Sequence, residues 1–181
     1  MGPNIDTGTD DNLSRFRRAM QSIATTLNSR VIRLFAATNS FVAPATLSPL
    51  TLPLSVPIQQ PAVIAGAMFR IEAWFTINTQ ASTGDTFTIN LTLAGQNIAV
   101  AGSASPGGGN FTAVYRGTLA IGPSGSYSVF GQFVINGTVK ATETDGSVTI
   151  SGNPSVGFSS SWNNPSGNYV VSRLLLVEQV N

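Results

Sequence analysis

The residues that could do acid–base chemistry are few in this sequence of 181 residues. It contains neither histidine nor cysteine, which removes the commonest general base, the commonest metal ligand and the thiolate nucleophile. Two carboxylates alone can hydrolyse a glycosidic bond, and the acids of residues 67–181 are Glu72, Asp85, Glu143, Asp145 and Glu178. Asp85 follows a glycine at a predicted turn, and Glu143 and Asp145 lie in a second predicted turn, Thr-Glu-Thr-Asp-Gly, where acids commonly accept local hydrogen bonds. We therefore predict no catalytic residue and no enzymatic activity.

The same turn acids are the candidates for binding a metal ion. Oxygen ligands of this kind can hold Ca²⁺, but Glu143 and Asp145 lack the spacing of an EF-hand loop. A solvated turn is the simpler interpretation, so we expect no metal site and no cofactor.

Two aromatic residues near the C-terminus could bind a ligand of another kind. Trp162 and Tyr169 lie in a run rich in serine and asparagine, a composition that suits stacking against a sugar ring. Trp162 also shares strand parity with Val156 and Phe158, which would place it at the hydrophobic core. Both interpretations stay open: Trp162 and Tyr169 are candidate glycan contacts, or Trp162 caps the core.

Charge gives little reason to expect nucleic acid or a membrane as a partner. Charged residues make up 9% of the chain, and its formal net charge is +1. Five of the nine basic residues lie before residue 34, but a nucleic-acid-binding arm usually carries a denser basic block. The sequence shows neither a signal-peptide core nor an apolar run of about 18 residues. We expect the chain to be made in a cytoplasm and to stay soluble, without a membrane partner.

Alternating apolar residues predict that residues 67–181 form an all-β domain. One face of a first strand would hold Phe69, Ile71, Ala73, Phe75 and Ile77, and one face of a second strand Phe87, Ile89, Leu91 and Leu93. The simplest interpretation pairs these two strands as antiparallel neighbours across the loop from Thr79 to Gly84. More short strands follow, about nine in all, separated by Gly, Pro, Asn and Ser turns. Asn136-Gly137 is the strongest local hairpin signal among them.

Residues 1–42 are predicted to be a tail and a helix. Asp10, Asp11 and Asn12 offer capping oxygens, and the helix would run from there to about Phe35. Its apolar stripe, at spacings of three and four, consists of Leu13, Phe16, Met20, Ile23, Leu27, Val31 and Leu34. The stripe fits a short coiled coil or a single helix packed on another body. The candidate anchoring residues are Leu13, Phe16, Met20, Ile23 and Leu27.

Residues 43–66 are predicted to be an extended, proline-rich arm. Prolines recur at nearly every fourth position, which excludes a helix: Pro44, Pro49, Pro53, Pro57 and Pro61. The leucine, valine and isoleucine residues between them are too apolar to be left in water. The arm should therefore lie along a surface of this subunit or of a neighbouring one.

The last strand carries apolar residues on both of its faces. Val170, Leu174 and Leu176 would point one way, and Val171, Leu175 and Val177 the other, so both faces need a cover. On the first strand, the face opposite the core residues is a mixed set that suits an interface better than open solvent. We therefore predict a subunit interface that contains Met68, Arg70, Trp74, Val170, Leu174 and Leu176.

This architecture resembles that of phage and viral structural proteins. The stretches FRIEAWFTIN, from Phe69, and SRLLLVEQV, from Ser172, resemble the single jelly-roll domains of trimeric capsid decoration proteins and of head- or tail-fibre knobs. The resemblance implies a homotrimer whose N-terminal segment anchors it to the particle. It transfers no binding-site residue.

The sequence thus predicts a single jelly-roll-like antiparallel β-sandwich, 67–181, with an N-terminal α-helix and an extended Pro-rich arm. Our first hypothesis for function is a non-enzymatic bacteriophage or viral protein of the capsid decoration type, located on the virion. Its partners would be copies of itself and other virion proteins, the capsid above all. The alternatives are a fibre or tail knob that binds a host receptor or glycan, a small coat protein that forms the shell, and a free carbohydrate-binding module.

Overall fold

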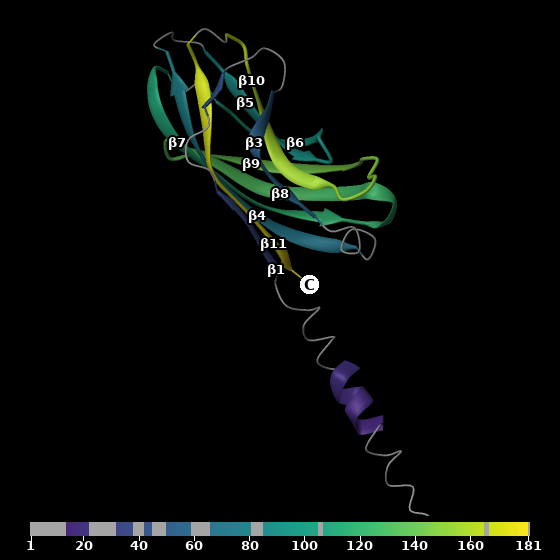
Figure 1. Cartoon of the computed structure of the whole chain (residues 1–181). Helices are drawn as coiled ribbons and strands as arrows, with labels where there is room; N and C mark the ends of the chain where they lie inside the picture. The colour runs from purple at the N-terminus through teal and green to yellow at the C-terminus, as the bar shows by residue number, and fades with distance from the viewer. Residues whose placement is uncertain are drawn as a thin grey trace, which may run out of the picture. The chain divides into compact units, whose positions relative to one another are not determined.

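The described part of the chain consists of one short helix and one β-domain. The computed structural model describes residues 14–21, 32–37, 42–44, 50–58, 66–80, 85–104, 107–164 and 167–180. A helix covers residues 14–21. A separate compact unit, Ile32–Val180, contains every strand of the described residues (Figure 1).

The β-domain is a sandwich of two antiparallel sheets. Its strands are β1 (Ile32–Ala37), β2 (Val42–Pro44), β3 (Leu50–Pro57), β4 (Ala67–Thr79), β5 (Phe87–Leu93), β6 (Gln96–Ala104), β7 (Gly109–Ile121), β8 (Ser126–Ile135), β9 (Thr138–Ser147), β10 (Ser155–Trp162) and β11 (Tyr169–Val180). The larger sheet has the order β1-β11-β4-β7-β8-β9, with β2 paired to β11, and the smaller sheet has the order β3-β10-β5-β6 (Figure 1). The predicted all-β, jelly-roll-like antiparallel sandwich is confirmed.

The hydrophobic core lies between the two sheets and is built from the residues that alternation predicted. On β4 and β5, all nine predicted inward side chains are buried: Phe69, Ile71, Ala73, Phe75, Ile77, Phe87, Ile89, Leu91 and Leu93. Aromatic rings join the sheets across the core. The ring centroids of Phe75 and Phe158 lie 5.2 Å apart, and those of Phe87 and Phe133 lie 6.1 Å apart, both with edge-on geometry.

The predicted pairing of the first two strands is wrong. β4 pairs with β11 and β7 in the larger sheet, whereas β5 pairs with β10 and β6 in the smaller one. Each strand has one fully apolar face, and such a face must be covered by a second layer. Because β4 and β5 belong to opposite layers, their apolar faces contribute to the same core without the strands being neighbours.

The predicted helix is wrong at its C-terminal end. Residues 32–37 form β1, which pairs along its whole length with β11 from Ile32↔Gln179 to Ala37↔Leu174. A short apolar run fits both the helical and the strand period, and an open sheet edge offers backbone hydrogen bonds that decide between them. The strands therefore begin well before residue 67, and residues 32–58 contribute β1, β2 and β3 to the sandwich.

Within the predicted proline-rich arm, residues 50–57 are extended, as predicted, and they form β3 of the chain's own sandwich. Leu52, Leu54 and Val56 of β3 are buried in the core, while Pro53 and Pro57 point to solvent. β3 is an edge strand, where the missing proline N–H costs little, and its register with β10 shifts around Pro53.

Two hairpins use two-residue turns with positive φ. Asn136 and Gly137 have φ angles of 51° and 75°, and they join β8 to β9 as the sequence predicted. Ala94 and Gly95, with φ angles of 51° and 77°, join β5 to β6 in the same way. The second turn was not predicted, because alanine rarely adopts this conformation.

A buried tyrosine lies against a glycine pair in the larger sheet. Gly117 and Gly131 are opposite each other on β7 and β8, and a Cβ added to either would lie 2.4 Å from Tyr115 Oη. The two glycines therefore make the room that the tyrosine ring needs. The Tyr115 hydroxyl has no hydrogen-bond partner among the described residues, and burial raises the pKa of Tyr115 to about 12.

We predict that Tyr115→Phe removes part of the loss of stability at alkaline pH. Unfolded chains lose this proton near the ordinary pKa of 10.0, while the folded state keeps it up to about 12. The contribution of Tyr115 to stability is therefore constant below pH 10 and falls from pH 10 to 12. Two pKa units correspond to roughly 3 kcal/mol of unfolding free energy. Urea unfolding of the wild type and of Tyr115→Phe at pH 8 and at pH 11.5 measures the unfolding free energy. An equal loss of unfolding free energy in both proteins between these two pH values would contradict the prediction.

Candidate interaction surface

The outward side of the larger sheet is the candidate functional surface. We call it the outer sheet face, meaning the side chains of β11, β4, β7, β8 and β9 that point away from the core. Strand register arranges these side chains in rows across the sheet. In order, three adjacent rows are Glu178-Arg70-Thr118-Phe130-Glu143, Leu176-Glu72-Arg116-Gln132-Ala141 and Leu174-Trp74-Val114-Val134-Val139.

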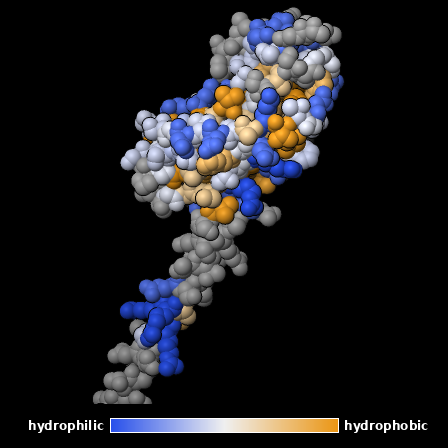
Figure 2. All heavy atoms as spheres, turned by 180° about the vertical axis from the view of Figure 1, so that it is seen from behind, coloured by the Kyte–Doolittle hydropathy of each residue, from blue (hydrophilic) through white to orange (hydrophobic). Residues whose placement is uncertain are grey.

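The third row is entirely apolar, and we call it the apolar row. Trp74 and Val139 in this row are 40% and 54% exposed. Met68 and Phe130, on the same face, are 47% and 53% exposed. Four large apolar side chains exposed on one sheet face make this face a candidate for contact with another molecule. In the space-filling view, hydrophobic residues reach the surface of the sandwich in several separate patches (Figure 2).

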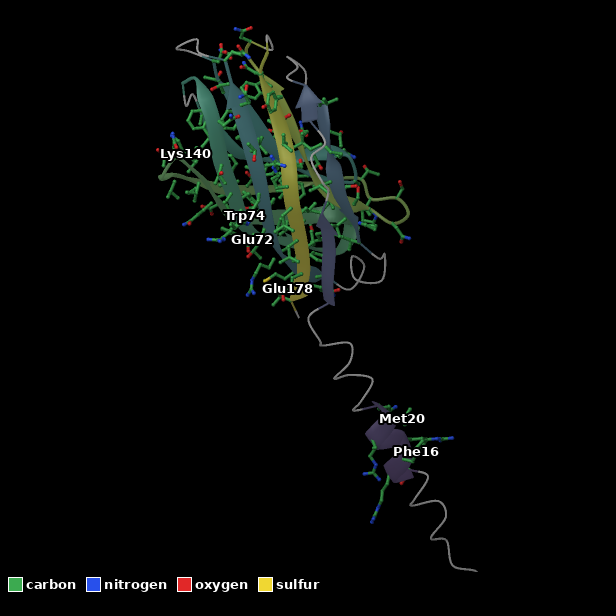
Figure 3. The ribbon with its side chains drawn as sticks, turned by 60° about the vertical axis from the view of Figure 1, so that its left-hand side comes forward. Phe16, Met20, Glu72, Trp74, Lys140 and Glu178 are labelled. Atoms are coloured by element: carbon green, nitrogen blue, oxygen red, sulfur yellow. The ribbon has the colours of Figure 1, made fainter. Side chains whose placement is uncertain are left out.

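The charged residues beside the apolar row are paired with one another. Arg116 donates from Nε and Nη2 to Glu72 Oε1 at 3.2 and 3.1 Å, and Trp74 Nε1 donates to the same oxygen at 2.9 Å. Arg70 Nη1 lies 3.2 Å from Glu178 Oε2. Figure 3 shows Glu72, Trp74 and Glu178 on this one sheet. Charges that are already paired cost less to remove from water than isolated ones, so a partner can cover this face.

The contacts with Trp74 and Arg116 lower the pKa of Glu72 below its ordinary value. The hydrogen bond from Trp74 lowers the pKa of Glu72 most, the Arg116 guanidinium lowers it further, and partial burial opposes both. Trp74 is therefore held in place at its polar edge, and its apolar ring is presented outward.

Five of the six predicted interface residues lie on the outer sheet face, and Val170 does not. Met68, Arg70 and Trp74 are exposed on β4, and Leu174 and Leu176 are half-buried on β11. Val170 is fully buried and belongs to the core, together with Leu175 and Val177. The register of β11 against β4 shifts between Ser172 and Leu174, and this bulge reverses the alternation that the sequence analysis carried through the whole strand.

Two of the predicted anchoring residues are described. Phe16 and Met20 lie four residues apart on the helix 14–21, and both are exposed, at 64% and 50% (Figure 3). They share one side of the helix with the spacing that the stripe predicted. Leu13, Ile23 and Leu27 lie outside the described residues. Among all the residues that the structure describes, no helix has the length and hydrophobicity needed to cross a membrane.

The two predicted glycan contacts do not form a stacking platform. Trp162 is 3% exposed, and its ring packs against Phe87 with centroids 5.5 Å apart. The alternative interpretation, that Trp162 caps the core, is confirmed. Tyr169 is half-buried at the start of β11, opposite Asn78.

The acids form neither of the constellations considered above. Glu143 and Asp145 lie within β9, which stays paired with β8 to Ser147, so the predicted turn is wrong. Asp85 is buried and accepts hydrogen bonds from the amides of Asn164 and Asn168 at 3.1 and 3.0 Å, which ties two loops together. Within the described ranges, no three acids, histidines or cysteines cluster as metal ligands would.

The sequence analysis did not identify Asn168 as a partner of Asp85. Asn168 is buried, and the Gln80 N–H also donates to its Oδ1 at 2.7 Å. Asparagine is common in exposed turns, so its type gave no signal for a buried structural role.

Comparisons with known proteins leave the function open. No family model and no curated protein matches the chain. Among solved structures, lectin II from Ulex europaeus is 15% identical with a TM-score of 0.38, covering 83% of this chain and 93% of its own. Peanut lectin with a 9mer peptide is 13% identical, with a TM-score of 0.39 and coverages of 84% and 98%. The binding domain of botulinum neurotoxin serotype D/C is 12% identical, with a TM-score of 0.35 and coverages of 83% and 48%. Likenesses this low carry no conclusion about function.

We predict that Trp74→Phe raises the pKa of Glu72, because it removes the strongest stabilising contact of the carboxylate. Arg116→Gln should raise it as well. Carboxyl carbon chemical shifts followed from pH 2 to 7 by NMR measure the pKa. Gln132→Ala is the control, since Gln132 neighbours Arg116 in the same row without contacting Glu72. An unchanged pKa in Trp74→Phe would show that the hydrogen bond is absent in solution.

Proposed function

We propose that this chain is a non-enzymatic structural protein of a virion, of the capsid decoration type. It forms a homotrimer through the β11–β4 half of the outer sheet face and attaches to the particle through its N-terminal segment. The observation that carries the self-association is the outward Trp74, locked to Glu72 and flanked by Leu174 in the apolar row. The number three and the position on a virion rest on the resemblance to jelly-roll decoration proteins.

A second copy of this chain fits the charge pattern of this half of the face. Its two ion pairs, Arg70–Glu178 and Arg116–Glu72, place equal numbers of both signs beside the apolar row. A partner with a strong net charge would leave either the arginines or the glutamates of this surface without opposite charges. A second copy of the chain brings one arginine for every glutamate. The formal net charge of +1 adds little repulsion between copies. Met68, Trp74, Leu174 and Leu176 would supply the apolar centre, and the ion pairs the polar rim.

The helix supports an anchoring role for the N-terminal segment. Phe16 and Met20 form an apolar side on an otherwise basic helix, where Arg15, Arg17 and Arg18 are exposed (Figure 2). An apolar side with cationic neighbours suits a complementary groove on another protein. The exposed rings and thioether would be buried only when that partner is present.

A second candidate function is a knob that binds a host glycan. It is favoured by a hollow on the β7–β9 half of the outer sheet face, lined by Phe130, Gln132 and Glu143.

We predict that Trp74→Ser weakens self-association by at least about tenfold, because a buried tryptophan is commonly a dominant contact of an interface. Light scattering of the purified wild type should give the mass of three chains, and Trp74→Ser should dissociate at higher concentration. Val100→Ser is the matched control, since Val100 is 54% exposed on β6 of the other sheet. A wild type that is monomeric at tens of micromolar, or an equal effect of both variants, would refute the proposed interface.

We predict that deletion of residues 1–31 abolishes attachment to the particle and leaves the sandwich folded, since every strand of the described residues begins at Ile32 or later. Co-sedimentation with particles of the encoding virus measures attachment, and far-UV circular dichroism measures folding. Phe16→Ser with Met20→Ser should reproduce the loss in the full-length chain, whereas Gln21→Ser should not. Full attachment of the truncated chain would rule out the anchor.

A further inference from the structure

The β7–β9 half of the outer sheet face contains a hollow of about 510 Å³. Its rim residues come from four strands: Arg70, Arg116, Thr118, Phe130, Gln132 and Glu143. Gly117 and Gly131 line it between β7 and β8. The hollow is shallow and open to solvent, so a ligand there would contact the protein with one face only.

Phe130 is the apolar centre of the hollow. Its side chain is 53% exposed, and its neighbours in the row are Thr118 and Glu143. Trp74 and Val139 differ from it, because they stand in the apolar row among other apolar side chains. An exposed aromatic ring surrounded by hydrogen-bonding groups offers one flat apolar contact and several polar ones.

The polar groups around Phe130 provide both donors and acceptors. Within the described residues, the side chains of Gln132 and Glu143 make no hydrogen bond or ion pair, and both are exposed. Arg116 uses Nε and Nη2 for Glu72, which leaves the N–H groups of Nη1 for a ligand. A ligand that fills this site must therefore accept and donate hydrogen bonds at its edge.

The charge around the hollow argues against an anionic ligand. The two arginines of the rim are already paired with Glu72 and Glu178, and Glu143 adds an unpaired negative charge. A phosphate, sulfate or sialic acid carboxylate would meet this carboxylate, and both arginines of the rim already have a carboxylate partner. The surface suits a neutral ligand with hydroxyl groups.

We propose that this hollow binds a neutral saccharide. The apolar face of one sugar ring stacks on Phe130, and its hydroxyls bind Gln132, Glu143 and the free N–H groups of Arg116. The site is complete within one subunit, so it does not depend on the proposed trimer. It lies beside the proposed subunit contact, with Arg70 and Arg116 at the border of the two.

The test is a glycan array that carries neutral, sialylated and sulfated oligosaccharides, followed by NMR titration of the best neutral one. Wild-type protein should bind a neutral oligosaccharide and shift amide resonances of Phe130 and Gln132. Phe130→Ala should lower the affinity at least tenfold, and Gln132→Ala should lower it less. Val139→Ala is the matched control, because Val139 is equally exposed on the same face outside the hollow; its affinity should be unchanged.

Three outcomes would overturn the proposal. They are no binding of any neutral oligosaccharide at millimolar concentration, binding confined to sialylated or sulfated ones, and an equal loss in Phe130→Ala and Val139→Ala. Light scattering of Phe130→Ala separates this site from self-association: a wild-type mass with lost saccharide binding supports the site, and a reduced mass with no saccharide binding by the wild type assigns Phe130 to the subunit contact instead.

Discussion

The aromatic contacts between the two sheets are the constraint on which the rest of this structure depends. Phe75 and Tyr115 of the larger sheet both pack edge-on against Phe158 of the smaller one, and Phe133 of the larger sheet packs edge-on against Phe87 of the smaller one. These rings set the distance between the two sheets and fill the core between them. The outward side chains of the larger sheet are therefore not needed to bury the core. The exposed apolar side chains found there are the basis of the proposed contact with another molecule.

The outer sheet face has two halves of different chemistry. On the β11–β4 half, Trp74 is held by Glu72, and the arginines and glutamates are matched among themselves. On the β7–β9 half, Phe130 is surrounded by polar groups, of which Gln132 and Glu143 have no partner in the described residues. The first half suits a second copy of the chain, and the second half suits a small hydroxylated ligand. The proposed self-association rests on the first half and the proposed saccharide binding on the second, and one β-sandwich supports both.

Local patterns in the sequence predicted local structure well. The alternation on β4 and β5, the extended proline-rich strand and the Asn136-Gly137 turn all follow from the two-residue period and from residues with restricted φ. Choices that depend on distant partners were not predictable in this way. Whether β5 pairs with β4, and whether residues 32–37 continue a helix or pair with β11, depends on which sheet edges are open. Because of the bulge near Ser172, Val170 points into the core, and no residue type in β11 predicts this bulge. Half of the candidate surface was found from the mixed face of β4, but Phe130 was missed because its neighbours come from other strands.

The central claim is that a second molecule covers Trp74 in solution. The chain has two tryptophans, and Trp162 is buried in the core, so the Trp162→Phe variant reports Trp74 alone. Its fluorescence emission and its quenching by iodide can be followed as the protein concentration is raised from nanomolar to tens of micromolar. The account predicts that the emission moves to shorter wavelength and that quenching falls as subunits associate. Emission and quenching typical of an exposed indole at every concentration would contradict it.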